Sequence, residues 1–426
     1  MGQVAATTAA LVCFAASLVY VVALILSQFQ RSRLAAKSIL AEQAVLRARL
    51  DLLLEERRIV QETRERTWSG PRKFIVKRKV AECRDVCSFY LAPHDGKPLP
   101  PFHPGQFLTF QLRIPGQNAP VVRCYSLSDA PAPDCDYYRV TIKKVPPPPD
   151  KPGMPPGLVS TFFHEHVNEG DILDVKVPSG RFYLDMTART PAVLIGGGVG
   201  ITPVLSMVNA VAQSGSRRET WFFLGVRNRS EHIQKAHLEE VAAKRPNVHL
   251  HVCYSDPGPD DKAGRDYHHA ERVSVKLLKQ LLPSNMYDFY ICGPPPMMTS
   301  LTQGLKEWGV PDDNVHFEAF GPATVKAVAP AAAPSAVAAT AQAFQISFTR
   351  SGRAFAWDQK MQSLLDFAAA HGVTIDSGCR RGACGTCKIA VRDGKFAYLS
   401  PPDYACEAGS CLTCCAVPTA DLTLDA

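Results

Sequence analysis

The hydrophobic pattern begins with an uncharged segment and continues into a charged helical one. Residues 9–27 carry no charged side chain, and nineteen helical residues span about 30 Å, the thickness of the hydrocarbon core of a membrane. Residues 31–66 lack Gly and Pro and are rich in Ala, Leu, Arg and Glu, which predicts a helix. A seven-residue interval of apolar residues runs along it, at Ile39, Leu46, Leu53 and Val60. This interval favours a stalk that forms a coiled-coil homodimer, with a single helix lying along the membrane as the alternative.

Beyond this helix the pattern predicts three folded modules. Residues 71–188 contain short runs of β-branched and aromatic residues separated by turn residues, which indicates an antiparallel β-barrel. Residues 189–321 alternate apolar strands with helical runs, which is typical of an α/β doubly wound parallel sheet. Residues 322–342 are nearly all Ala, Pro, Val, Thr and Ser and predict a linker. The last module covers residues 343–426.

The charge distribution supports a membrane location. The net charge is +7, and residues 31–79 hold fourteen basic against six acidic residues, so the rest of the chain is nearly neutral. A nucleic-acid-binding protein would carry this excess on a folded face, so that class is excluded. The excess follows the uncharged segment, as expected beside an anionic membrane surface. We expect a single-pass anchor over residues 1–30, a basic helical stalk over 31–70, an external N-terminus and cytoplasmic modules, as in a bacterial inner membrane.

Half of the fourteen cysteines fall in the last 48 residues. Cys379, Cys384 and Cys387 form the pattern C-x4-C-x2-C, the spacing of a plant-type [2Fe–2S] cluster with a distant fourth ligand. A zinc site would more often show two separated C-x2-C pairs. By spacing alone the fourth ligand is open among three residues, Cys411, Cys414 and Cys415.

Two motifs in the barrel region predict a site for a pyrophosphate and a flavin. The first is Arg123-Cys124-Tyr125-Ser126, and the second is the run Gly157 to Ser160 that opens a predicted helix. An arginine and a helix N-terminus together bind a pyrophosphate through charge and free backbone N–H groups. A tyrosine there can cover a flavin ring, and a serine hydroxyl can bond its N5 atom.

Two further motifs lie in the α/β region. The glycine-rich run from Gly196 to Pro203 joins a strand to a helix, where nucleotide phosphates approach backbone amides. It departs from G-x-G-x-x-G, so a Rossmann dehydrogenase is not expected. Cys292-Gly293-Pro294 ends a later strand at the same sheet edge, and the run from Phe317 to Gly321 closes the module.

These motifs, in this order, resemble the ferredoxin–NADP reductase superfamily over roughly residues 73–321. The resemblance implies that FAD is held by Arg123, Tyr125, Ser126, Ile142, Lys143, Gly157, Leu158, Val159 and Ser160. It implies that NAD(P)H is held by Gly197, Gly198, Gly200, Thr202, Cys292 and Gly293, with Glu318 and Phe320 near the flavin. The reacting atoms would then lie beside Ser126, Cys292 and Glu318.

The C-terminal module resembles plant-type ferredoxins, which implies a β-grasp-like α+β fold. Its ending, LTCCAVPTADLTLD, is similar to the closing segment of that family and selects Cys414 as the fourth ligand. Cys406, Cys411 and Cys415 are then ordinary thiols. FAD is favoured over FMN because FMN-binding relatives lack the helix-opening loop. Arg227 follows the second strand of the sheet and suits a 2′-phosphate, but similar residues occur in NADH-using relatives, so we expect NADH with NADPH as the alternative.

The module order resembles the reductases of phenylacetyl-CoA epoxidase, ketosteroid hydroxylase and the hybrid-cluster protein. This implies an oxidoreductase that passes electrons from NAD(P)H through FAD and [2Fe–2S] to an electron-accepting protein. A membrane oxygenase, hydroxylase or desaturase is the expected acceptor. The alternatives are a small NADH:quinone or haem-protein reductase, and a redox-sensing electron carrier with a vestigial nucleotide site.

Overall fold

The structure is a computed structural model in which the chain divides into two compact units, Met1–Glu65 and Arg66–Ala426. It describes residues 66–320 and 344–426 except 69, 119, 133, 148–152, 381, 383, 400, 401, 403 and 405, together with positions 20, 21, 24, 28, 43, 46, 47, 49 and 50. Most of the predicted anchor, most of the stalk and the whole linker therefore lie outside the described residues. Within the part of the chain that is described, no helix is both long and apolar enough to cross a membrane.

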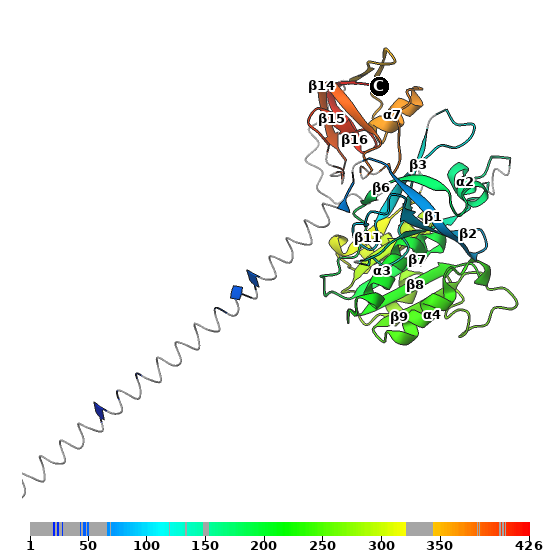
Figure 1. The fold of residues 1–426 in the computed structure, drawn as a ribbon, viewed down its shortest axis with the longest axis vertical. Coiled ribbons are helices and arrows are strands. Elements are labelled where there is room, and N and C mark those ends of the chain that lie inside the picture. Colours follow the sequence, from blue (N-terminus) through cyan, green and yellow to red (C-terminus); the bar gives the residue numbers. More distant parts are fainter. Residues whose placement is uncertain are drawn as a thin grey trace, which may run out of the picture. The chain divides into compact units, whose positions relative to one another are not determined.

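The first module is an antiparallel six-stranded sheet in the order β4-β3-β6-β1-β2-β5. Figure 1 labels β1, β2, β3 and β6 of this sheet. Its strands are β1 (Arg72–Cys83), β2 (Val86–Pro93), β3 (Phe107–Leu112), β4 (Val121–Ser126), β5 (Tyr138–Lys143) and β6 (Ile172–Ser179). The two edge strands meet through a bridge between Leu127 and Val140, which closes the sheet into the predicted barrel. Helix α2 (Leu158–His166) packs on it through Phe163, which contacts the rings of Phe89 and Phe110 in the core.

The second module is a parallel sheet in the order β11-β10-β7-β8-β9. Its strands are β7 (Ala192–Gly197), β8 (Thr220–Val226), β9 (Val248–Tyr254), β10 (Asp288–Cys292) and β11 (Val315–Glu318). Its helices are α3 (Ile201–Gln213), α4 (Lys235–Lys244), α5 (Val275–Leu281) and α6 (Pro295–Glu307). Leu194 of β7 joins a core with α3 and α4, whereas Val193 and Ile195 join a core with α5 and α6. Helices thus cover both faces, as the doubly wound prediction requires.

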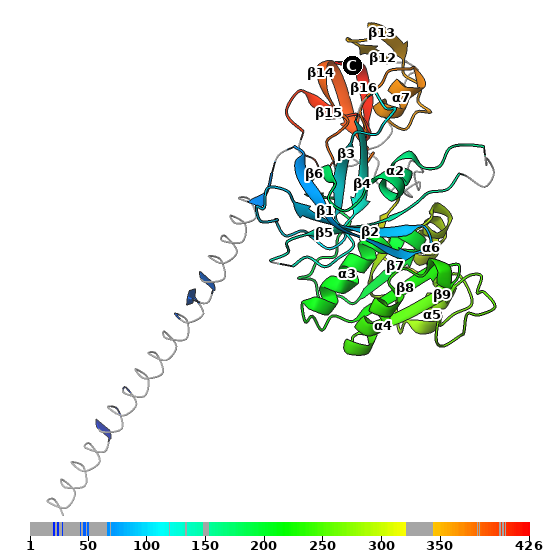
Figure 2. The ribbon, with the colours of Figure 1, turned by 45° about the vertical axis from the view of Figure 1, so that its right-hand side comes forward.

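The third module is a mixed sheet in the order β13-β12-β16-β14-β15 with one helix (Figure 2). Its elements are β12 (Gln345–Phe348), β13 (Arg353–Ala356), α7 (Leu364–Ala370), β14 (Lys388–Tyr398), β15 (Ser410–Leu412) and β16 (Ala416–Leu424). Ser363 caps α7, since its hydroxyl accepts the Asp366 N–H at 3.1 Å. Phe367 of α7 shares a core with Phe348 and Leu424, so the helix covers one face of the sheet. This agrees with the α+β prediction.

An ion pair between buried Arg218 and half-buried Asp288 ties the connection between the barrel and the parallel sheet to β10. The Arg218 guanidinium lies 2.9 Å from the Asp288 carboxylate and donates to the Asp185 carbonyl at 3.0 Å. Removing one partner of a buried pair leaves the other charge without compensation. We therefore expect Arg218→Met to lower the free energy of unfolding of this module by about 3 kcal/mol. Arg217→Met is the matched control, because Arg217 is exposed; calorimetry showing equal effects for both variants would contradict the prediction.

Candidate active site

The strand order of the parallel sheet reverses between β7 and β10, and this is where the glycine-rich run lies. The register pairs Gly196 of β7 with Cys292 of β10. A Cβ atom added to Gly200 would lie 2.4 Å from the Cys292 carbonyl oxygen and 2.7 Å from the Gly293 Cα atom. Only a residue without a side chain permits this backbone contact. The glycine-rich run and the Cys292 motif, both predicted to bind NAD(P)H, therefore lie side by side. They lie where the strand order reverses, which is where α/β sheets bind their ligands.

The residues of this loop fit the phosphates of a dinucleotide. Helix α3 begins directly after the short 3-10 turn Gly198–Gly200, and its Ile201 N–H donates to the Gly198 and Val199 carbonyls. The positive end of the helix dipole at this loop favours an anion there. Gly198 has φ +54°, and open space lies where its Cβ would be. The Thr202 hydroxyl donates to the Val199 carbonyl at 3.1 Å, which stabilises the turn. Arg227 is exposed just after β8, the strand beside β7.

The three residues predicted to lie beside the reacting atoms are brought together. The Ser126 hydroxyl at the end of β4 donates to the Glu318 carboxylate at the end of β11, with Oγ and Oε2 3.4 Å apart. Glu318 in turn pairs in register with Cys292 of β10. All three side chains are buried. Phe320 lies two residues beyond Glu318 and is partly exposed. The Ser126–Glu318 contact joins the barrel to the parallel sheet, so the site lies where these two modules meet.

The barrel residues of the first motif fit a flavin nucleotide. Arg123 is exposed, and its guanidinium donates to the Val122 carbonyl at 2.7 Å. The Tyr125 ring packs edge-on against Phe110 and Phe163, and burial raises the pKa of Tyr125, so its hydroxyl stays protonated at neutral pH.

The second barrel motif forms the start of α2. Gly157 is the N-cap of this helix and makes no side-chain cap hydrogen bond, which leaves the first-turn N–H groups to an anion. The Ser160 hydroxyl donates to the Gly157 carbonyl at 3.0 Å and accepts the Val145 N–H at 3.1 Å. Leu158 is exposed and Val159 is buried in the barrel core. The loop is thereby fixed at the helix start, as a pyrophosphate site requires.

The structure does not bring the remaining two FAD candidates into this constellation. The Ile142 side chain belongs to the barrel core, and its carbonyl is hydrogen-bonded to Nε2 of His164 at 2.9 Å. The Lys143 ammonium lies 3.8 Å from the Glu231 carboxylate of the second module. The FAD contacts of these two residues remain a prediction.

The four predicted iron ligands lie as two pairs. Cys379 and Cys384 exchange N–H to sulfur hydrogen bonds of 3.2 and 3.3 Å. Cys387 and Cys414 pack in one cluster of side chains, and the Gly382 N–H donates to the Cys414 sulfur at 3.3 Å. Among the described residues, no three His, Cys, Asp or Glu side chains form a group that would hold a metal ion. Two thiolate pairs instead suit a cluster of two irons.

The backbone of the cluster loop explains its glycines. Gly382 and Gly385 have φ +74° and +70°, and a Cβ on Gly382 would lie 2.9 Å from the Cys415 sulfur. Of the three candidates for the fourth ligand, Cys414 has the sulfur that accepts the Gly382 N–H. The other two, Cys411 and Cys415, are buried.

A neighbour of the cluster ligands escaped the sequence analysis. Oγ1 of Thr386 is hydrogen-bonded to the Cys384 sulfur at 3.2 Å. The C-x-x-C spacing around Thr386 was the signal that could have found it, because this residue lies between two ligands.

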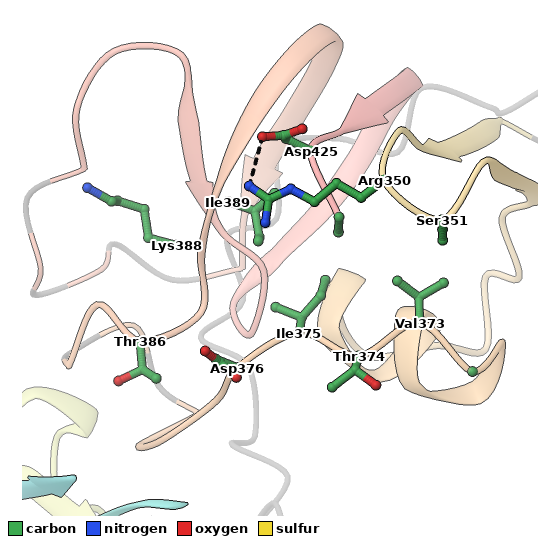
Figure 3. A pocket seen from close by; sticks show the side chains of 12 residues that line it. Arg350, Ser351, Val373, Thr374, Ile375, Asp376, Thr386, Lys388, Ile389 and Asp425 are labelled. Atoms are coloured by element: carbon green, nitrogen blue, oxygen red, sulfur yellow. Dashed lines mark hydrogen bonds and ion pairs between the residues drawn. The ribbon is translucent and has the colours of Figure 1, made fainter. Parts of the chain in front are cut away.

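A cavity of about 530 Å³ lies in the third module (Figure 3). An ion pair between Arg350 and Asp425, 3.1 Å long, crosses it, and Thr386 and Lys388 line the side that adjoins the cluster loop. Its lining contains none of the residues predicted to hold the flavin or the nicotinamide. It is therefore separate from the nucleotide sites.

The contact between Gly200 and Cys292 generates a prediction. Gly200→Ala must push the glycine-rich loop away from the Cys292 carbonyl oxygen. A misplacement of about 1 Å in an active site typically costs tenfold or more in rate. We expect a lower kcat/KM for NADH with unchanged flavin and iron content. Gly258→Ala is the control, since its Cβ would meet only the Asp261 carboxylate at 3.5 Å. Steady-state kinetics with an artificial electron acceptor measure the effect, and a Gly200→Ala enzyme as active as the control contradicts the prediction.

Three family models match the chain, each within one of the folded modules. An oxidoreductase FAD-binding domain matches residues 73–183, an oxidoreductase NAD-binding domain matches 194–303, and a 2Fe-2S iron-sulfur cluster binding domain matches 347–419. These matches agree with the predicted cofactors FAD, NADH and [2Fe–2S].

Individual relatives cover different parts of the chain. A flavohemoprotein of Halalkalibacterium halodurans is 41% identical over 60% of this chain and 61% of its own length. The FAD/NAD-binding domain of a Vibrio cholerae nitric oxide dioxygenase is 29% identical, with a TM-score of 0.52, over 60% of this chain and all of that one. Phthalate dioxygenase reductase is 25% identical, with a TM-score of 0.50, over 84% of this chain and 98% of that one.

The chain thus spans about three fifths of the length of the curated flavohemoproteins that it matches. By contrast, the similarity to phthalate dioxygenase reductase extends over nearly all of that chain. The chain is therefore a flavin- and NAD-binding oxidoreductase with a third, [2Fe–2S]-binding module.

Proposed function

We propose that this protein is a reductase that passes electrons from NADH through FAD and the [2Fe–2S] cluster to a separate acceptor protein, of which a terminal oxygenase or hydroxylase is the favoured class. The observation that carries the proposal is the contact between the cluster loop and the barrel. The Lys176 ammonium on β6 donates to the Cys384 carbonyl at 3.5 Å, and a Cβ on Gly378 would lie 2.9 Å from the Val122 side chain on β4. The cluster loop thereby adjoins the strand that carries the flavin motif.

When bound, FAD accepts an electron pair from NADH and releases it singly, and the cluster carries one electron at a time. The chain's own residues bind and orient these groups. The Glu318 carboxylate accepts a hydrogen bond from the Ser126 hydroxyl and so fixes the orientation of that hydroxyl at the flavin site. Both side chains are buried, so little water competes for this hydrogen bond.

The class of acceptor is inferred from the relatives. Phthalate dioxygenase reductase, as its name states, serves a dioxygenase, and it matches all three modules of this chain in extent. The flavohemoprotein relatives favour a haem protein as the second candidate acceptor. Anaerobic reduction of a candidate oxygenase or haem protein by NADH and this reductase would distinguish them, because only the true acceptor is reduced within a catalytic turnover.

The paired cysteines generate a prediction about electron flow. Cys414→Ala removes the sulfur that accepts the Gly382 N–H and packs with Cys387. We expect NADH to bleach the flavin of this variant at a rate close to that of the unaltered protein, with loss of the cluster spectrum and of protein-acceptor reduction. Anaerobic stopped-flow spectroscopy measures both steps.

Cys406→Ala is the matched control, because Cys406 is half-buried and outside the two pairs. It should retain both steps. Failure of NADH to bleach the flavin of the unaltered protein would refute the reductase proposal and favour an electron carrier with a vestigial nucleotide site.

We also propose that the uncharged segment 9–27 anchors the protein in a membrane with the modules in the cytoplasm. Its support is the sequence, together with the exposure of Tyr20, Val21 and Leu24 on the described helical positions. Each lysine placed in a spanning helix costs about 3 kcal/mol.

Replacing Val21 and Leu24 by Lys should therefore move the protein from the membrane fraction to the soluble fraction of a cell lysate. The control replaces Leu46 and Leu50 by Lys, because these residues are also exposed but lie beyond the uncharged segment. Immunoblotting of the two fractions measures the distribution. An unaltered distribution of the Val21 and Leu24 double variant would refute the anchor.

A further inference from the structure

The cluster loop packs on one face of strand β4. Successive side chains of a strand point to opposite faces of the sheet, so Val122 projects from the same face as Ser126. A Cβ atom on Gly378 would lie 2.9 Å from the Val122 side chain, so the loop lies close against this face. At about 3.3 Å per residue, Val122 and Ser126 are about 13 Å apart along the strand. The cluster loop and the predicted flavin residue Ser126 therefore share one face of one strand.

A lysine of β6 contacts the same loop. Lys176 pairs in register with Thr109 of β3, which pairs with Cys124 of β4. Residues paired in this way project side by side from one face, so Lys176 lies on the face that carries Val122. Its ammonium donates to the Cys384 carbonyl at 3.5 Å. The hydrogen bond thus meets the cluster loop at one of the predicted iron ligands.

An arginine just beyond β6 makes a second contact of this kind. The Arg181 guanidinium donates to the Pro402 carbonyl at 3.4 Å. Pro402 packs on the cluster loop, since a Cβ atom on Gly382 would lie 3.0 Å from the Pro402 Cβ atom. The Tyr404 N–H donates to the Gly382 carbonyl at 3.0 Å and fixes this segment on the loop. The two cationic side chains of the barrel therefore end on carbonyls in the cluster loop or directly beside it.

A small number of contacts can position the third module because it belongs to the same chain. Residues 322–342, the predicted linker, join it to the parallel sheet, so docking on the barrel is an intramolecular event at high effective concentration. A hydrogen bond with a charged donor is also about twice as strong as one between neutral groups. Loss of both charged donors should therefore release the cluster loop from the barrel.

We propose that Lys176 and Arg181 are positioning residues that dock the cluster loop on the barrel and thereby set the rate of electron transfer from the flavin to the cluster. In that step one electron leaves the reduced flavin and reduces the oxidised cluster, and no bond between heavy atoms forms or breaks. The rate of such a transfer falls steeply with the distance between the two groups, so it depends on docking. The inference rests on the proposed function, which supplies the electrons.

The first test is anaerobic stopped-flow spectroscopy of the full chain, loaded with FAD and cluster and mixed with NADH. In the double variant Lys176→Met with Arg181→Met we expect cluster reduction to slow about tenfold or more, while NADH bleaches the flavin at an unchanged rate. Lys176→Arg keeps the charged donor and should retain most of the rate. The control is Lys73→Met with Lys144→Met, because both lysines pair with carboxylates of the barrel itself.

The second test is hydrogen–deuterium exchange of the same proteins without NADH. Undocking uncovers the face of β4, so we expect faster amide exchange over residues 121–126 in the double variant than in the control. Exchange over β8, residues 220–226, should be equal in both, because this strand lies in the parallel sheet. If the double variant does not take up the cluster, Lys176→Met and Arg181→Met are compared singly with the control.

Equal rates of cluster reduction in the double variant and the control overturn the inference, as does equal exchange over residues 121–126. The exchange measurement needs neither NADH nor an acceptor protein. If NADH fails to bleach the flavin of the unaltered protein, the proposed function is refuted, and the exchange measurement alone decides whether Lys176 and Arg181 dock the cluster loop.

Discussion

The alternation of side chains along β4 is the constraint on which the arrangement of the cofactor sites depends. The strand is hydrogen-bonded to β3 along its whole length, so its residues cannot rotate independently. Arg123 and Tyr125 are therefore directed to one face, and Val122 and Cys124 to the other. A shift of one residue in this register would exchange the two sets of side chains. Arg123 and Tyr125 would then leave the flavin side of the strand, and Val122 would leave the cluster loop.

A second constraint holds the nicotinamide side of the site in place. The glycine-rich loop touches the backbone at Cys292 and Gly293, so β7 and β10 end at the same level. Glu318 then follows in register on β11 and reaches Ser126 of the barrel. The hydrogen bond between these two buried residues crosses the boundary of the modules, so the geometry of the flavin site depends on both. Burial strengthens such a bond, because little water competes for it.

Elements with a clear pattern were predictable from the sequence, and β4 shows why others were not. Five barrel strands alternate or bear aromatic residues between turn signals, whereas β4 reads Val-Val-Arg-Cys-Tyr-Ser, with apolar and polar residues on both faces. That mixture arises because one face of β4 packs toward α2 and the other face packs toward the cluster loop. For Ile142, the resemblance implies a flavin contact; the structure places its side chain in the barrel core, and the flavin contact remains a prediction.

The sequence by itself determined the three modules, their order and the chemistry of each, because spacing along the chain dictates which backbone atoms and sulfurs can gather in one loop. C-x4-C-x2-C and the glycine-rich run are local patterns of this kind. Only the tertiary structure decided that Ser126 meets Glu318, 192 positions away, and that Lys176 of the barrel meets the Cys384 carbonyl. These contacts depend on how separate sheets pack against one another. No pattern within one stretch of the sequence encodes which distant residues come together.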